Sequence, residues 1–203
     1  MKNYFKKFSI MFVMALIVLG IGIIQNGNVA NAASTTWNPN DKGSKVTLSN
    51  NNLTASYTNY TGSNVRATEG KSQGKWYWEV YVNEQGTKSC FNVGISNLAF
   101  NIENGYFYLS DATKWLYRSG LNQSKGKTYG LLLDMNSLTL EIREDNVTKV
   151  TSTIVAGTLF PTCGDDNSAG TCTFTANFGL TSFKYDLPSG YLPYDSSSSI
   201  TLK

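Results

Sequence analysis

The segment GKSQGKWYWEV, residues 70–80, contains three adjacent aromatic residues followed by Glu79. A carboxylate among aromatic rings could act as a general acid or base, and the rings alone could stack against a sugar. In a β-strand, however, alternate side chains share one face. One face of such a strand would carry only apolar residues, namely Trp76, Trp78, Val80 and Val82. A stripe of this kind is typical of the interior of a β-sandwich, so we expect the tryptophans in the core.

Glu79 falls on the opposite, partly polar face of the same segment, between Tyr77 and Tyr81. A carboxylate in this setting more often pairs with a cation than takes part in catalysis. We therefore expect Glu79 to pair with a basic side chain such as Arg66.

The chain contains no histidine, which excludes Ser–His and Cys–His nucleophiles and histidine-ligated zinc. Glycosidases that use two carboxylates remain, and the nearest pattern is EIRE, residues 141–144. There Arg143 stands where a second acid would share the face of Glu141, and Glu144 points to the other face. We predict that the protein is not an enzyme; a degenerate glycoside hydrolase is the remaining enzymatic alternative.

A polar loop, GDDNSAG at residues 164–170, could gather Asp165, Asp166 and Asn167 around calcium. Dedicated calcium loops place their ligands at alternate positions, and this spacing is missing here. A solvated turn is the simpler interpretation, so we expect neither a metal nor another cofactor.

Residues 1–32 have the pattern of a secretory signal peptide. Three lysines precede an apolar run at residues 8–24, and the segment ends with small residues, Ala30 and Ala32, at the expected cleavage site. An uncleaved membrane anchor is the alternative, because the apolar run approaches the roughly 20 residues that span a bilayer. We expect a secreted, extracellular protein.

The rest of the chain is expected to form one domain, residues 33–194, followed by a polar tail, residues 195–203. Of the 17 Lys and Arg residues, three lie in the predicted signal, which leaves 14, the same number as Asp and Glu. A neutral domain without a basic patch argues against a nucleic-acid partner.

Cysteines in an exported chain meet oxidising conditions. Cys163 and Cys172 bracket a polar loop that can double back on itself, and we predict a disulfide between them. Closing this loop would stabilise the fold by roughly 2 to 3 kcal/mol. Cys90 is then left over.

Short alternating segments separated by Gly, Asn and Ser predict an all-β fold, an antiparallel sandwich or barrel without helices. The expected strands share apolar alternation: residues 45–49, 53–58, 64–68, 75–83, 90–96, 129–135, 138–144, 149–153 and 173–179.

The order of several motifs resembles the SPRY domain family. The motifs are Trp37, VTLSNNNLTAS (46–56), VRATEGKSQGKWYWEV (65–80), NVGIS (92–96), YGLLLDMNSLTL (129–140), FPTC (160–163) and TANFGLTSFKYDLPSGYLP (175–193). The resemblance implies a bent antiparallel β-sandwich of two sheets, similar to concanavalin-like lectins, that binds partners through loops at one rim. The sequence departs from the family where EIREDN, residues 141–146, replaces an aromatic-Lys-Asn-Gly turn.

The resemblance also places Gly86, Thr87, Tyr106 and Gly164 where family members contact their partners. The loop at residues 57–64 lies beside them in the family and lacks the family's residues, but its tyrosines offer large contact area at low entropic cost. The predicted partner-binding residues are therefore Tyr57, Tyr60, Gly86, Thr87, Tyr106 and Gly164. Ordinary strand packing is the alternative for Tyr106.

Together these patterns predict a secreted, monomeric, non-catalytic module that binds a protein or peptide. A lectin-like module that binds glycan at a cell surface is the alternative, because exposed Tyr, Trp, Asn and Asp suit either ligand. A membrane would be involved only if the signal were retained.

We predict cleavage between Ala32 and Ala33, because this site has alanine at both positions that require small residues. The intact mass of the extracellular protein should correspond to a chain that starts at Ala33. Recovery only from membranes, with residues 8–24 retained, would contradict this prediction and indicate an anchor.

Overall fold

The computed structural model describes residues 34–58, 62–87, 91–103, 111–120, 123–165 and 171–196. These residues form strands, turns and bends, and they include no helix that could cross a membrane. The strands in this described part are β1 (Trp37–Lys42), β2 (Val46–Ser49), β3 (Thr54–Thr58), β4 (Ser63–Ala67), β5 (Lys75–Gln85), β6 (Phe91–Ser96), β7 (Lys114–Arg118), β8 (Thr128–Asp134), β9 (Thr139–Glu144), β10 (Val147–Thr153), β11 (Phe160–Asp165), β12 (Thr171–Asn177) and β13 (Leu192–Pro193).

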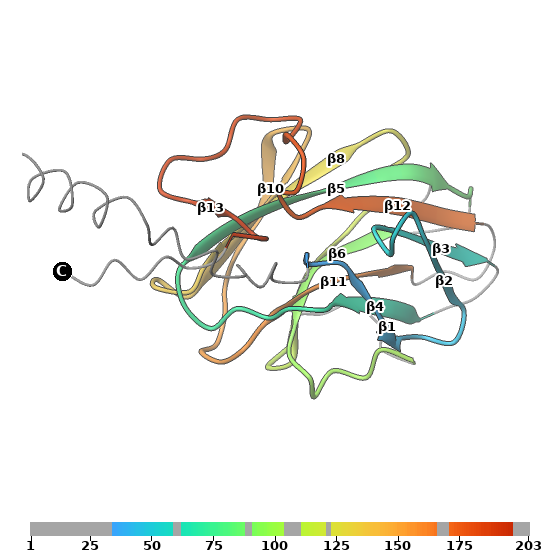
Figure 1. Cartoon of the computed structure of the whole chain (residues 1–203), viewed down its shortest axis with the longest axis horizontal. Helices are drawn as coiled ribbons and strands as arrows, with labels where there is room; N and C mark the ends of the chain where they lie inside the picture. The colour runs from blue at the N-terminus through green and yellow to red at the C-terminus, as the bar shows by residue number, and fades with distance from the viewer. Residues whose placement is uncertain are drawn as a thin grey trace, which may run out of the picture. The chain divides into compact units, whose positions relative to one another are not determined.

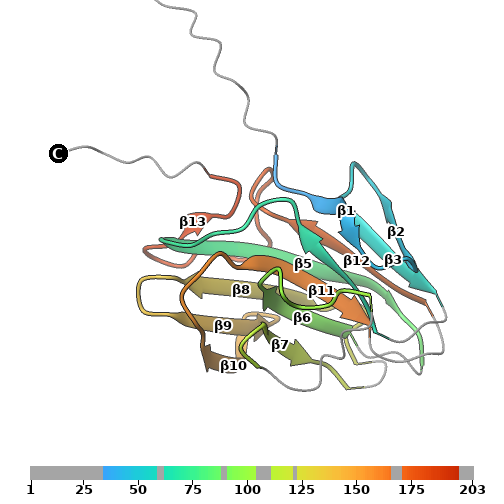
Figure 2. The same cartoon turned by 90° about the horizontal axis from the view of Figure 1, so that it is seen from below.

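The strands form two sheets packed face to face (Figures 1 and 2). Within the described residues, the smaller sheet has the order β1-β4-β11-β6-β7, and the larger has the order β10-β9-β8-β5-β12-β3-β2. All neighbours on these two paths are antiparallel, and β13 alone pairs in parallel with the start of β5. The predicted all-β sandwich is confirmed.

Strand β5 lies in the middle of the larger sheet and supplies the centre of the core. Its inward residues are almost completely buried: Trp76 (1% exposed), Trp78 (0%), Val80 (0%) and Val82 (0%). The ring of Trp78 makes an edge-to-face contact with the ring of Tyr194, with centroids 5.1 Å apart. The prediction that the two tryptophans belong to the core is confirmed.

The two ends of the domain meet beside this core. The backbone N–H of Thr35 donates a hydrogen bond to Asp195 Oδ1 at 2.6 Å, and the hydroxyl of Tyr194 donates to the Glu69 carbonyl at 2.9 Å. The residues that close the sandwich therefore come from opposite ends of the described chain.

Four strands were not expected from the sequence: β1, β7, β11 and β13. Strand β1 contains a proline and shows little apolar alternation, so its sequence does not have the usual pattern of a strand. Strand β11 is central in the smaller sheet, where Phe160–Asp165 pairs with both β4 and β6. Burial on both faces of a central strand removes the alternation by which a half-exposed strand is recognised.

The predicted disulfide is not present. Cys163 lies on β11, a strand that was not expected, and Cys172 lies on β12, which begins at Thr171, before the expected strand; the two strands belong to different sheets. Both side chains are fully buried, and the structure holds both as thiols. Burial raises the pKa of the Cys163 thiol, and the nearby Cys172 raises it further. Cys90 lies outside the described residues.

Trp78→Ala is expected to lower the free energy of unfolding by about 3 to 5 kcal/mol, because it empties a fully buried position in the core. Tyr81→Ala is the matched control, since Tyr81 lies on the opposite face of the same strand and is 42% exposed; its cost should stay within about 1 kcal/mol. Urea unfolding measures both. Equal midpoints for the two variants would contradict the assignment of the two faces.

Candidate functional site

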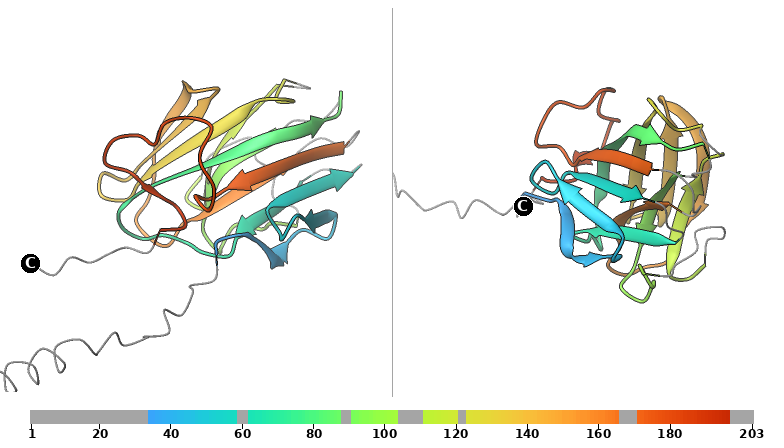
Figure 3. Two further views of the ribbon diagram at one scale, coloured as in Figure 1. Left: turned by 45° about the horizontal axis from the view of Figure 1, so that its top comes forward. Right: turned by 90° about the vertical axis from the view of Figure 1, so that its right-hand side faces the viewer.

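The loops that follow β3, β5 and β11 leave the sandwich at the same end. In the larger sheet, Gln85 pairs with Cys172 and Thr58 pairs with Thr171. In the smaller sheet, Asp165 pairs with both Ser63 and Phe91. This end lies at the right of Figure 1 and faces the viewer in the right panel of Figure 3. We call it the rim, defined by Thr58, Gly62, Gly86, Thr87, Asp165 and Thr171.

Two of the predicted contact residues lie on the rim. Gly86 follows the last residue of β5, and its backbone N–H donates to the Thr171 carbonyl at 2.8 Å. Thr87 is exposed beside it. Tyr60 and Tyr106 lie outside the described residues, so their predicted contacts stay predictions.

Tyr57 lies in the core rather than at the surface. Its side chain is 1% exposed, stacks on Phe174 with centroids 5.5 Å apart, and donates a hydrogen bond to the Cys163 carbonyl at 3.1 Å. Strand β3 ends at Thr58, as expected, so Tyr57 belongs to the strand, where it points inward with Ala55, and not to the loop. Alternation from Ala55 was the signal that would have assigned this face.

Gly164 is also buried, and it supports the rim from behind. A Cβ atom at this position would lie 1.9 Å from Asn64 Oδ1 and 2.8 Å from the Ser63 carbonyl. Only glycine leaves room for the Asn64 side chain to cross β11. The Asn64 amide in turn donates to the Gly62 carbonyl at 3.0 Å, which fixes one rim loop.

Buried side chains also fix the start of the loop after β5. Gln85 accepts a hydrogen bond from the backbone N–H of Ser124 at 2.5 Å and donates to the Ser119 hydroxyl at 3.2 Å. The same hydroxyl accepts from the backbone N–H of Phe91 at 3.0 Å. These bonds join β5, β6 and the β7–β8 connection, so Gly86 and Thr87 project from a rigid base.

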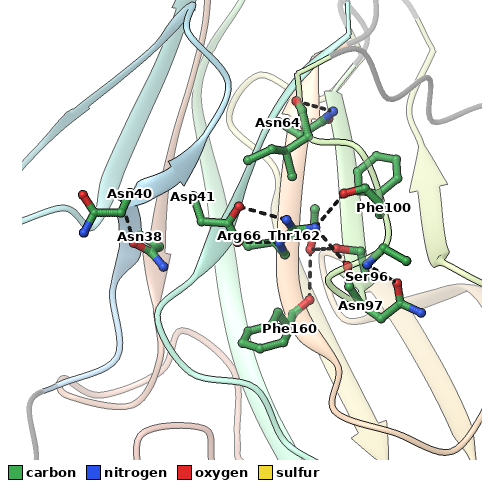
Figure 4. Close-up of polar contacts among 12 residues, drawn as sticks. Asn38, Asn40, Asp41, Asn64, Arg66, Ser96, Asn97, Phe100, Phe160 and Thr162 are labelled. Carbon is green, nitrogen blue, oxygen red and sulfur yellow. Dashed lines mark hydrogen bonds and ion pairs between the residues drawn. The ribbon is translucent and has the colours of Figure 1, made fainter.

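Arg66 fastens two segments over the outer face of the smaller sheet (Figure 4). Its guanidinium donates to both carboxylate oxygens of Asp41, at 2.6 and 2.8 Å, and to the carbonyls of Asn97 and Phe100, at 2.9 Å each. Arg66 is 5% exposed. A buried cation requires such complete hydrogen bonding, which here ties β1 and the loop after β6 to β4.

The expected pairing of Glu79 with Arg66 is wrong, because the two residues belong to different sheets. The buried Glu79 carboxylate accepts from the Tyr77 hydroxyl at 2.9 Å and from the backbone N–H groups of Lys184 and Tyr185, at 2.7 and 3.0 Å. Burial raises the pKa of Tyr77, and the Glu79 carboxylate raises it further. These bonds hold residues 179–191, here called the strap, against the outer face of the larger sheet (Figure 3, left).

Two side chains of the EIRE segment form a salt bridge. Arg143 Nε donates to Glu141 Oε1 at 2.7 Å, and the Thr148 hydroxyl donates to the same oxygen at 2.6 Å. Burial alone would raise the pKa of Glu141, but these two hydrogen bonds lower it below its ordinary value.

No group of three or more possible metal ligands occurs among the described residues. In the sequence, the polar loop at residues 164–170 is the candidate for calcium binding. Residues 166–170 of this loop lie outside the described residues.

The arrangement of the sheets matches solved structures of SPRY domains. The SPRY domain of human HERC1 aligns with a TM-score of 0.56 and 14% sequence identity, over 72% of this chain and 99% of that chain. The TRIM65 PSpry domain aligns with a TM-score of 0.53 and 15% identity, over 71% of this chain and 89% of that one. Stonustoxin aligns with a TM-score of 0.55 and 16% identity, over 71% of this chain but 27% of its own.

No protein-family model matches the sequence, and no curated protein matches it. The likeness is therefore one of structure: the chain has a SPRY-type fold, as its motif order indicated.

Arg66→Met is expected to lower the free energy of unfolding by about 3 to 5 kcal/mol, since it leaves the Asp41 carboxylate and two carbonyls without their donor. Arg66→Lys keeps the charge but loses the planar fork, and should cost about 1 to 3 kcal/mol. Chemical unfolding of both variants measures the difference. A lysine variant as stable as the wild type would show that charge alone, without the fork, holds β1 and the 97–100 segment.

Proposed function

We propose that this protein is a secreted, non-catalytic module that binds a protein or peptide partner through the rim. The main support is the convergence of the loops after β3, β5 and β11 at one end of a SPRY-type sandwich. Loops held by a rigid scaffold are the usual place for a binding surface. Two solved structures with this fold are named as SPRY or PSpry domains of larger proteins.

The way the rim is built supports the same proposal. Gln85 and Asn64 are buried beneath it and hold the loop bases with hydrogen bonds, while Thr87 is exposed. Surfaces prepared in this way lose little conformational entropy when a partner binds. Tyr60 and Tyr106, from the sequence prediction, would supply the aromatic contacts that carry most of the energy in such interfaces.

The signal-peptide pattern of residues 1–32 supports secretion, and the neutral charge of the remaining chain supports a protein partner over nucleic acid. The absence of histidine and the salt bridge between Glu141 and Arg143 support a binding role without catalysis. We propose that the module acts as a monomer.

The test begins with affinity capture from the medium in which the protein is found, followed by a binding measurement with the purified partner. Thr87→Arg, which adds bulk and charge to the rim, should weaken binding roughly thirtyfold, because a central contact is worth ~2 kcal/mol or more. Tyr60→Ala and Tyr106→Ala should have effects of similar size. All three should melt like the wild type, within about 1 kcal/mol.

Thr153→Arg is the matched control, since Thr153 is an exposed threonine on β10 at the opposite end of the larger sheet. It should leave affinity unchanged. If all rim variants bind as tightly as Thr153→Arg, the rim is not the binding surface. If Tyr106→Ala melts like Trp78→Ala, Tyr106 belongs to the core.

A further inference from the structure

A second surface, independent of the rim, lies on the outer face of the larger sheet. A pocket of about 570 Å³ opens there, and strands β12, β5 and β8 form its floor. This volume lies within the range of small-molecule sites, about 300 to 1,000 Å³. The residues that carry the argument are Asn50, Glu79, Tyr81, Asn83, Thr175 and Lys184, all of which line it.

Tyr81 lies at the centre of this floor. It pairs with Thr175 on one side and with Thr128 on the other, and its side chain is 42% exposed. No described residue stacks on its ring, whereas the ring of Tyr77, four residues earlier on the same face, makes an edge-to-face contact with the ring of Phe183, with centroids 4.9 Å apart. An uncovered ring on a central strand offers a flat apolar surface with a hydroxyl at its edge.

Asn83 has an orientation imposed by its neighbours. The Thr175 hydroxyl donates to Asn83 Oδ1 at 2.9 Å, and it is also hydrogen-bonded to the Thr54 hydroxyl at 2.9 Å. Because Thr175 occupies its oxygen, Asn83 presents its amide nitrogen to the pocket beside Tyr81. This nitrogen donates to no described residue. This nitrogen provides two donors for a ligand oxygen.

Two segments form the walls of the pocket. On one side, the strap is fixed by Glu79 and by the Asn177 amide, which donates to the carbonyls of Thr181 and Ser182 at 3.2 and 3.0 Å. On the other side, the turn between β2 and β3 has three successive asparagines, residues 50–52, with φ of 52°, 51° and 63°. This left-handed turn carries the Asn50 side chain to the pocket, with its amide nitrogen 3.4 Å from the Thr54 hydroxyl.

The charged groups in the pocket are already occupied. The Glu79 carboxylate accepts three hydrogen bonds from the protein, and Lys184 Nζ donates to the Thr128 hydroxyl at 3.2 Å and lies 3.7 Å from Asp145. An ionic ligand would compete with these partners. The groups left for a ligand are neutral: an aromatic ring, amides and hydroxyls.

From this chemistry we propose that the pocket binds a neutral saccharide. One face of a sugar ring is apolar and would lie on Tyr81, while its hydroxyl groups would accept from Asn83 and exchange hydrogen bonds with Asn50 and Thr175. An extended peptide is less suited, because the floor strands are paired on both sides and offer no open edge. This second site goes beyond the rim and does not depend on it.

The test is calorimetric titration of the purified full-length secreted protein with neutral tetrasaccharides of glucose, mannose, galactose and N-acetylglucosamine in different linkages. We expect at least one to bind with a dissociation constant of 1 mM or below. Tyr81→Ala should weaken that binding at least tenfold, since it removes the stacking surface. Asn83→Asp should weaken it at least fivefold, because it keeps the acceptor for Thr175 but loses the two donors.

Thr87→Arg and Thr153→Arg are the controls and should bind the saccharide like the wild type. The proposal is wrong if no tetrasaccharide binds, or if binding survives in both Tyr81→Ala and Asn83→Asp. It is also wrong if no saccharide binds and Tyr81→Ala abolishes capture of the rim partner. The pocket would then be part of the surface that contacts the protein partner. Loss of partner binding in Thr87→Arg alone, with saccharide binding kept, would support two separate sites.

Discussion

The structure depends on the two-residue alternation of strand β5. Inward, Trp78 and its neighbours fill the centre of the core, and the ring of Tyr194 closes over them. Outward, Glu79 holds the strap and Tyr81 forms the floor of the pocket. At its end, Gln85 holds the base of the rim. A shift of one residue in the pairing of β5 would exchange these faces, placing the carboxylate in the core and the tryptophans in water.

The rim and the pocket are built in different ways. At the rim, loops project from bases fixed by Gln85 and Asn64, so a binding surface there can change in sequence without changing the sandwich. In the pocket, the proposed binding groups other than Asn50 come from the sheet itself, and hydrogen bonds between neighbouring strands set their orientation, as Thr175 does for Asn83. The first design suits varied partners, and the second suits a small ligand of fixed shape.

The sequence was most informative where a residue's role follows from alternation along its own strand. The inward stripe from Trp76 to Val82 and the all-β fold could be predicted in this way, and motif order indicated the SPRY-type arrangement. Contacts between distant segments could not be predicted. Nothing near Arg66 in the chain indicates Asp41 or the Asn97 carbonyl as its partners, and nothing near Cys163 shows that β11 faces β12 across the core. Tyr57 could have been placed from its alternation with Ala55 on a strand that was expected to end at Thr58.

The hydrogen bond between Thr35 and Asp195 and the pairing of Gln85 with Cys172 also have a consequence for folding kinetics. Strand β5 finds one neighbour, β12, only after some 90 further residues of chain have been made, and the first strand is secured by nearly the last described residue. Such a high contact order slows folding and leaves little stable structure in a partial chain. An emerging polypeptide of this kind cannot complete the larger sheet until its last strands have been made.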